Sequence, residues 1–189
     1  MVLLTQEHAQ KRDTFFRYIF GNHEGYATIC RRNHGEKTWY EEFFLWPIQA
    51  SILADYVTTH AVTSDLWFCP HLFKSNRRLK ENVQATPSAW SDLDFCMPDR
   101  LLVEPTVTIE SSPGRYQALW IFEEEVAPQD AEDISKRIAY HHREDGADIS
   151  GWDLTQLLRI PYTFNHKYEA SGLLPQVQVK SSCQQVHST

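Results

Sequence analysis

Two aspartates one residue apart form the pattern in this chain that most suggests chemistry. Asp92 and Asp94 lie in a stretch that alternates polar with apolar residues between Pro87 and Pro98, which predicts a strand. Side chains at positions i and i+2 of a strand share a face, so the two carboxylates are expected to lie together. Neighbouring carboxylates repel each other unless a cation lies between them, which makes the pair a candidate site for a divalent metal ion. The alternative is an exposed pair of acids on an edge strand, because so short a pattern often arises by chance.

A second candidate lies further along the chain, between two apolar runs. Residues 106–110 and 116–124 each predict a strand, and the Ser-Ser-Pro-Gly-Arg sequence at 111–115 predicts a β-hairpin turn between them. Backbone N–H groups, hydroxyls and a guanidinium at one turn suit a phosphate ligand. The side chains that could hold this phosphate are Ser112, Arg115 and Gln117. An ordinary solvated hairpin is the alternative.

A third group of polar residues follows near the C-terminal end. Asp153 stands six residues before Arg159, and Asn165 and Lys167 follow on a segment that Pro161 makes non-helical. The acid could complete a metal site begun by the first pair, while Arg159 and Lys167 could hold an anionic substrate. A surface salt bridge between Asp153 and Arg159, worth about 0 to 1 kcal/mol, is the competing explanation.

The most basic stretch of the chain lies at residues 74–80. The net charge of −7 argues against binding of nucleic acid by overall charge, so a polyanion would need a local basic patch or a bound metal ion. The candidate nucleic-acid contacts in this stretch are Lys74, Arg77, Arg78 and Lys80. A solvated loop explains the same residues equally well.

The elements that must position these residues follow from length and periodicity. With 189 residues, 42% of them hydrophobic, the chain is expected to form one globular domain. Helices are predicted at about 5–20, 48–58 and 128–143, and strands at 25–30, 38–45 and 65–69 besides those already named. The order strand, hairpin, helix, strand in the second half favours an antiparallel sheet with helices on one face, and so an α/β fold of the α+β type.

Two modules are expected within this domain, at about 1–85 and 86–169. Residues 170–189 are rich in Ser and Gln and lack periodicity, which predicts a linker or disordered tail that leads to a further domain. The four cysteines have no metal-binding spacing, no apolar run reaches the ~20 residues of a membrane span, and the N-terminus is too polar for a signal peptide. We therefore expect a cytoplasmic protein with no membrane partner.

Histidines and aromatic residues allow other interpretations. Tyr140, His141 and His142 suggest a rolling-circle nickase, but adjacent histidines on a helix diverge by about 100° and do not form a chelating pair. The aromatic residues between Trp39 and Trp46 could stack on nucleobases, although such clusters are more often part of a core.

The three polar groups, in this order, resemble the archaeo-eukaryotic primase superfamily, and in particular the primase-polymerase domains of phages, plasmids and other mobile elements. Residues 159–167 read Arg-Ile-Pro-Tyr-Thr-Phe-Asn-His-Lys, similar to the Arg-x-Pro-Gly-Thr-x-Asn-x-Lys run of many members. The resemblance covers about residues 67–168. Gln117 stands where the second motif often has histidine, and Tyr162 where glycine is common.

This resemblance implies a small N-terminal α/β module packed on a sheet of the RNA-recognition-motif type, with the active site in the cleft between them. It implies a DNA-dependent primase and polymerase in the replication of a phage or mobile element, with single-stranded DNA as template and a helicase as a candidate downstream partner. Two Mg²⁺ or Mn²⁺ ions would be held by Asp92, Asp94 and Asp153. The nucleoside triphosphate would be held by Ser112, Arg115, Gln117, Arg159, Asn165 and Lys167.

Two alternatives to this activity stay open at the level of sequence. A nucleotide- or single-strand-binding module with weakened catalysis is suggested by Gln117 in the second motif. A metal-dependent nuclease would use the same carboxylates but would need no nucleoside triphosphate.

Overall fold

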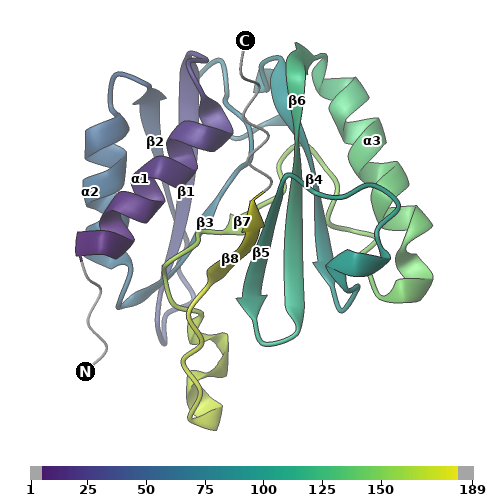
Figure 1. Cartoon of the computed structure of the whole chain (residues 1–189). Helices are drawn as coiled ribbons and strands as arrows, with labels where there is room; N and C mark the ends of the chain where they lie inside the picture. Colours follow the sequence, from purple (N-terminus) through teal and green to yellow (C-terminus); the bar gives the residue numbers. More distant parts are fainter. Residues whose placement is uncertain (1–5, 183–189) are drawn as a thin grey trace.

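Two four-stranded antiparallel sheets lie side by side in the computed structural model, which describes residues 6–182 (Figure 1). The first sheet has the order β2-β1-β3-β7, with β1 (Gly25–Asn33), β2 (Tyr40–Trp46), β3 (Ser64–Phe68) and β7 (Leu158–Arg159). The second has the order β4-β6-β5-β8, with β4 (Thr86–Asp94), β5 (Val107–Ser112), β6 (Arg115–Val126) and β8 (Gln178–Ser182). Helices combined with antiparallel sheets confirm the predicted α+β class.

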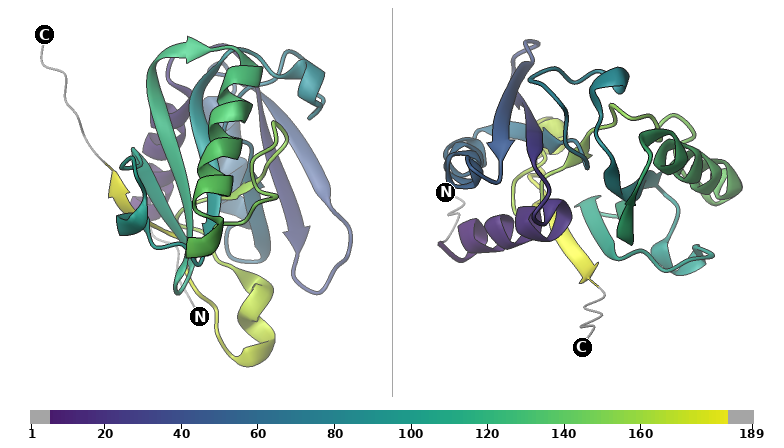
Figure 2. Two further views of the ribbon diagram at one scale, coloured as in Figure 1. Left: turned by 90° about the vertical axis from the view of Figure 1, so that its right-hand side faces the viewer. Right: turned by 90° about the horizontal axis from the view of Figure 1, so that it is seen from above.

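Among residues 6–182, three α-helices lie on the outer sides of the sheets (Figure 2). Helices α1 (Gln6–Phe20) and α2 (Ala50–His60) lie beside the first sheet, and α3 (Pro128–His141) packs on β4 of the second. The apolar side of α1 explains its position, since Phe15 and Phe16 meet the ring of Phe68 edge-on at 5.2 and 5.8 Å. The predicted helix start at Thr5 lies outside the described residues. Within residues 6–182, no helix is both long and apolar enough to cross a membrane.

One hydrophobic core joins the two sheets. Its buried side chains include Phe68 from the first sheet and Trp90 and Leu119 from the second. Strand β7, predicted to belong with the second module, pairs instead with β3 of the first sheet, with Trp67 opposite Arg159. The chain therefore returns to the first sheet after residue 157, so residues from both expected modules contribute to that sheet.

The structure corrects the predicted linker at residues 170–189. Strand β8 pairs antiparallel with β5, and Val177, just before it, is fully buried. A strand there supplies hydrogen-bond partners to β5, which would otherwise be an open sheet edge. The polar composition of the stretch did not predict a strand, because backbone pairing does not require an apolar sequence. Residues 183–189 of the predicted tail lie outside the described part of the chain.

Candidate active site

The paired aspartates lie at the end of β4, where its pairing with β6 is irregular. Leu93 between them is fully buried, whereas Asp92 and Asp94 are partly exposed on the opposite face of the strand. The backbone of Asp94 is in the left-handed region, with φ of 46°, so the strand turns at this point. Both carboxylates thus share one face, as the alternation of the sequence predicts.

Each carboxylate of the pair has a partner on β6. Arg115 forms an ion pair with Asp94, and Nε2 of Gln117 donates to Oδ2 of Asp92 at 3.3 Å. Burial raises the pKa of Asp92 to about 6, and the negative charges of Asp148 and Asp94 act in the same direction. Asp92 therefore lacks the positive charge that would favour its ionised form, and a divalent cation would supply it.

One pocket gathers the predicted site residues from both sheets. The described side chains that line it come from β3, β4, β7, the β5–β6 hairpin and the 3₁₀ segment η4 (His166–Ser171), together with the residues just before two of these elements. They are Trp67, Asp92, Asp94, Ser111, Ser112, Arg115, Gln117, Leu157, Arg159, Asn165, Lys167 and Tyr168. All the predicted metal-binding and nucleotide-binding residues except Asp153 thus meet in one place.

Asp153 is the exception among the predicted site residues. Its Oδ1 accepts from the backbone N–H and the hydroxyl of Thr155, both at 2.6 Å, so the carboxylate closes a local turn. Its charge acts on Cys69 and His71 rather than on Asp92. Asp153 does not line the pocket.

Asp148 is a further acid beside Asp92 that the sequence analysis did not single out. Like Asp153 it does not line the pocket, and its Oδ1 accepts from the backbone N–H and the hydroxyl of Ser150 at 2.8 and 2.7 Å. Its backbone N–H donates to the carbonyl oxygen of Asp92 at 3.0 Å, and its charge raises the pKa of Asp92. Gly151 allows the turn after Asp148 to lie against β4, because an added Cβ at position 151 would lie 2.8 Å from Cβ of Asp92. The available signal was a second acid ahead of Arg159, five residues before Asp153.

Gln117 ties the aspartate pair to β7. Besides its bond to Asp92, its Oε1 accepts the backbone N–H of Arg159 at 2.8 Å, and the side chain is only 5% exposed. Both ends of the amide are therefore occupied within the protein. These bonds hold Gln117 between β4 and β7, and its contact with phosphate stays a prediction.

Arg159 is buried against an acid that the sequence did not single out. It pairs with Asp65 rather than with Asp153, and its guanidinium lies over the ring of Trp67 at 4.2 Å. Asp65 also accepts from Nη2 of Arg32 at 3.3 Å and from the backbone N–H of His166 at 2.9 Å. This acid therefore organises the cationic side of the pocket, and the competing explanation of an Asp153–Arg159 pair is wrong.

The segment after β7 is fastened to the hairpin. Nδ2 of Asn165 donates to the carbonyl of Ser111 at 2.9 Å, and Oγ of Ser112 donates to the hydroxyl of Tyr168 at 3.4 Å. Lys167 is exposed at the edge of the pocket. Among the residues that line the pocket, the cations free to meet an anionic ligand are thus Lys167 and, when it leaves Asp94, Arg115.

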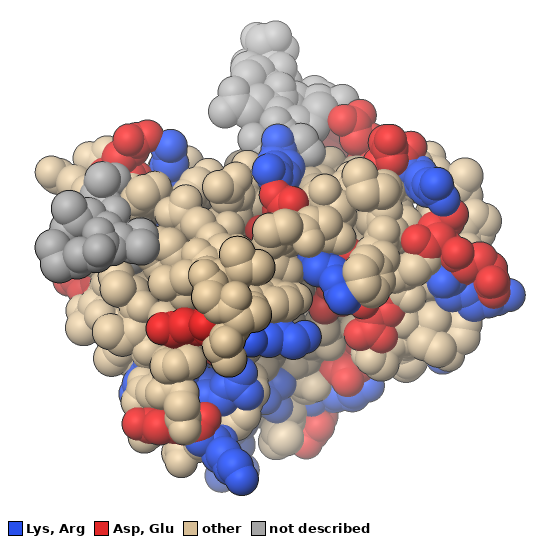
Figure 3. Space-filling view, turned by 90° about the horizontal axis from the view of Figure 1, so that it is seen from below, with Lys and Arg blue, Asp and Glu red and all other residues tan. Residues whose placement is uncertain are grey.

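The predicted basic stretch contains two cations that are paired within the protein and two that are exposed. Nε of Arg78 donates to Glu41 and its Nη1 to the carbonyl of Thr155, both at 2.6 Å, and Lys80 pairs with Glu132 at 2.8 Å. Lys74 and Arg77 are exposed. Neither kind lines the pocket. Figure 3 looks onto the end of the molecule that carries the β5–β6 turn and η4, and shows Lys and Arg side chains gathered near its centre.

This architecture of two antiparallel sheets with helices is also the fold of solved primase and primase-polymerase structures. Residues 69–187, more than half of the chain, match the family of RepB DNA-primase N-terminal domains. The chain belongs to that family. A search of curated protein sequences finds no match.

Three solved structures share the fold. The crystal structure of primase RepB' has a TM-score of 0.67 at 17% identity, covering 92% of this chain and 56% of that one. The catalytic domain of the same primase in complex with initiator DNA has a TM-score of 0.65 at 16% identity, covering 93% and 85%. The primase-polymerase domain of cyanophage S-2L has a TM-score of 0.65 at 8% identity, covering 92% and 90%. This chain thus spans little more than half of the length of the first.

Proposed function

We propose that this chain is the catalytic domain of a DNA-dependent primase-polymerase, which joins nucleotides on a single-stranded template in the replication of a plasmid or phage. The observation that carries the proposal is the pocket in which the paired aspartates face the hairpin, Arg159 and Lys167. Membership of the RepB primase family supports it. The solved complex of a neighbour's catalytic domain with initiator DNA supports DNA as a partner.

The acids of the site fit a divalent metal ion. Asp92 is held with a raised pKa and without a cationic partner, which a metal ion would reverse. Mg²⁺ or Mn²⁺ would be held by Asp92 and Asp94. Neither Asp148 nor Asp153 lines the pocket, and we propose Asp148 as the third acid because its backbone contacts Asp92 and its charge acts on that carboxylate. Such ions, when bound, supply stabilisation of the attacking 3′-oxygen and of the negative charge on the triphosphate.

The other residues of the pocket bind and orient the nucleotide. Arg115 and Lys167 present the accessible cations, and their charges match those of a triphosphate. Arg159 is held by Asp65 against Trp67, so it contributes a cation with a fixed position. Gln117 and Asn165 keep β4, β7 and the hairpin in register with one another. Binding therefore pre-orders the two reactants, which is the main contribution of such sites to rate.

The experiment that tests the proposal is dinucleotide synthesis on a single-stranded template with Mn²⁺. The Asp92→Asn, Asp94→Asn double variant is expected to lose synthesis, and the matched control is the exposed pair Asp99→Asn, Asp133→Asn, which is expected to keep it. Unchanged circular dichroism would show that both variants fold. Equal synthesis by parent and double variant would refute the proposal, and degradation of the strand without any nucleoside triphosphate would indicate a nuclease instead.

A further inference from the structure

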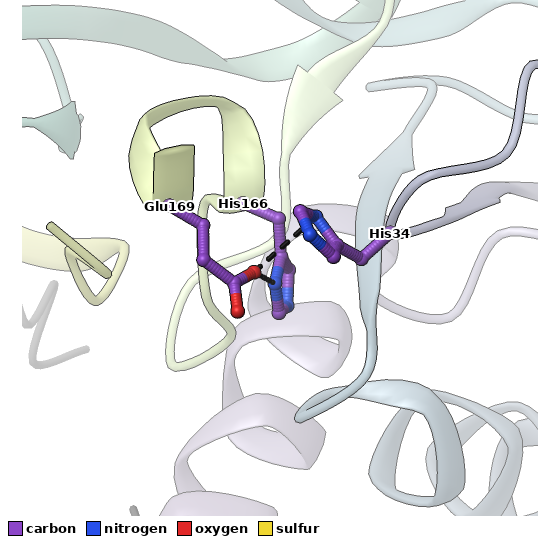
Figure 4. Close-up of side chains that lie close together, drawn as sticks. All are labelled: His34, His166 and Glu169. Carbon is purple, nitrogen blue, oxygen red and sulfur yellow. Dashed lines mark hydrogen bonds and ion pairs between the residues drawn. The ribbon is translucent and has the colours of Figure 1, made fainter. Parts of the chain in front are cut away.

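Two histidines and a glutamate converge beside the pocket without lining it (Figure 4). His34 comes from the turn after β1, and His166 and Glu169 come from η4, more than a hundred residues later. Oε2 of Glu169 lies 2.8 Å from Nδ1 of His166 and 3.2 Å from Nδ1 of His34. One carboxylate oxygen is thus shared by two imidazole rings.

We propose that His34, His166 and Glu169 form a metal site of their own, which takes a borderline divalent transition ion such as Zn²⁺. The three candidate ligand atoms all lie within 4.8 Å of one another. Ligand atoms around a tetrahedral zinc ion are about 3.4 Å apart, given metal–ligand distances of about 2.0 to 2.2 Å. Small side-chain rotations would therefore bring the three atoms into coordination.

The type and surroundings of these ligands favour zinc over magnesium. Imidazole nitrogen suits Zn²⁺, Co²⁺ and Ni²⁺, whereas Mg²⁺ selects oxygen. The ring of His166 is buried, its backbone N–H is held by Asp65, and its Nε2 has no hydrogen-bond partner among the described residues. A buried ring fixed in this way is pre-ordered as a ligand, while His34 and Glu169 are exposed enough to admit an ion.

A second cluster contains a histidine whose two ring nitrogens both have hydrogen-bond partners. Cys96, His142 and Asp145 also lie close together. There Nδ1 of His142 bonds Asp145 at 3.1 Å, and its Nε2 accepts the backbone N–H of Leu102 at 3.5 Å. Both ring nitrogens are occupied, so a metal ion would have to break an existing bond. In the His34 cluster the Nδ1 of the buried His166 ring faces Glu169, itself a candidate ligand, and its Nε2 has no hydrogen-bond partner among the described residues.

A bound ion would join two segments that lie far apart in the sequence. It would clamp the turn after β1 onto η4, and thereby the segment whose Asn165 and Lys167 reach the pocket. This consequence rests on the proposed function, but the binding of the ion does not.

Titration of tag-free, chelator-stripped protein with Co²⁺ tests the site. The Asp92→Asn, Asp94→Asn variant serves as the parent, so that binding is independent of the proposed catalytic site. One Co²⁺ per chain is expected, with a visible absorption band that Zn²⁺ displaces. His34→Gln and Glu169→Gln are each expected to weaken binding by at least about tenfold.

The matched control is His23→Gln. His23 forms a single exposed pair with Glu125 at 2.8 Å, so it has the same chemistry without a second ring. Its replacement is expected to leave binding unchanged. Absence of stoichiometric Co²⁺ binding, or equal affinity in His34→Gln, Glu169→Gln and their parent, would overturn the proposal.

A pair of indole rings, one exposed and one half-buried, carries a second, independent inference. The rings of Trp39 and Trp67 lie 4.6 Å apart, and the guanidinium of Arg32 lies 5.3 and 5.6 Å from them. Trp39 is 51% exposed, whereas Trp67 lines the pocket. The pair therefore continues the pocket outward as an aromatic and cationic surface, although a core position for Trp39 was the favoured expectation.

We infer that Trp39, Trp67 and Arg32 form a surface on which a base of the single-stranded template stacks, an inference that rests on the proposed function. Indole faces accept any base, and a neighbouring guanidinium meets the phosphate backbone. The unpaired bases of a single strand expose apolar faces, and these faces can stack on aromatic side chains. The position next to the pocket would place the stacked base close to the reacting nucleotide.

Binding of fluorescein-labelled oligothymidine without nucleotide tests this surface in the Asp92→Asn, Asp94→Asn parent. Trp39→Ala is expected to weaken binding by about tenfold, and Trp39→Phe by less. Trp152→Ala is the control, since that indole packs against Lys136 at 4.5 Å, away from the pocket. Equal binding by Trp39→Ala and its parent would overturn the inference even if the chain proves to be a polymerase.

Discussion

The backbone N–H of Asp148 donates to the carbonyl oxygen of Asp92 at 3.0 Å. This bond holds the turn that Asp148 closes with Ser150 against the strand that carries the aspartate pair, whereas the turn that Asp153 closes with Thr155 has no such bond to Asp92 among the described residues. The two acids that precede Arg159 are therefore expected to differ sharply in their importance.

Asp148→Asn is expected to lower dinucleotide synthesis by about 100-fold or more, because it removes a charge beside the proposed metal ions. Asp153→Asn is the matched control and should keep most of the activity, since asparagine can still accept from Thr155. Steady-state synthesis with Mn²⁺ measures both. The reverse order would restore Asp153 as the third acid.

Asp92 is expected to make stability depend on pH. Its folded-state pKa is raised from 3.8 to about 6, so stability falls as pH rises through this range and the carboxyl must ionise while buried. Without metal at about pH 7.5, Asp92→Asn should therefore be more stable than the parent by about 1 to 3 kcal/mol, with little difference near pH 4. Urea unfolding in chelator measures this. A difference that stays constant with pH would contradict the assignment to Asp92.

Gln117 is expected to matter through position rather than charge. Gln117→Ala leaves Asp92 and the backbone N–H of Arg159 without their partner, which should cost about 1 to 3 kcal/mol of stability and about tenfold in synthesis. Gln178→Ala, at an exposed position of β8, is the control and should change neither. Thermal unfolding and synthesis assays that show no effect of Gln117→Ala would remove its positioning role.

Tyr162 has φ of 60°, the left-handed conformation that glycine adopts easily. The tyrosine thus keeps the backbone path suited to the glycine that is common at this position in related motifs. Tyr162→Gly should be about 1 kcal/mol more stable than Tyr162→Ala, because only alanine meets a steric cost there. At the exposed helical Asp133 the order should invert. Chemical denaturation of the four variants compares them, and the same order at both sites would contradict this explanation.

The exposed cations of the basic stretch are expected to contact the template. Lys74→Ala with Arg77→Ala should weaken single-strand binding and reduce its salt dependence, by about 0.7 in slope for each phosphate that is no longer neutralised. Arg100→Ala with Arg143→Ala removes the same charge from exposed positions elsewhere and should have less effect. Fluorescence anisotropy across a salt series measures both pairs, and identical slopes would exclude Lys74 and Arg77 from the template path.

The local features of this protein followed from sequence because they depend on near neighbours. Apolar periodicity predicts α1, α3 and most strands, and alternation places Asp92 and Asp94 on one face. The Pro-Gly turn predicts the hairpin that presents Ser112 and Arg115. The run at 159–167 was enough to suggest the primase superfamily, with which the fold and the family match agree.

Only the tertiary structure decided which distant residues meet. The position of Asp148 beside Asp92 depends on a turn packed against β4, and the ion pair of Arg159 with Asp65 depends on the pairing of β7 with β3, its neighbour in the first sheet. Strand β8 has a polar sequence, and its backbone pairs with the edge of β5 that would otherwise be open. Sequence periodicity predicts the face of an element on which a side chain lies. It does not predict which distant residue that side chain contacts, because folding brings the two together across many residues.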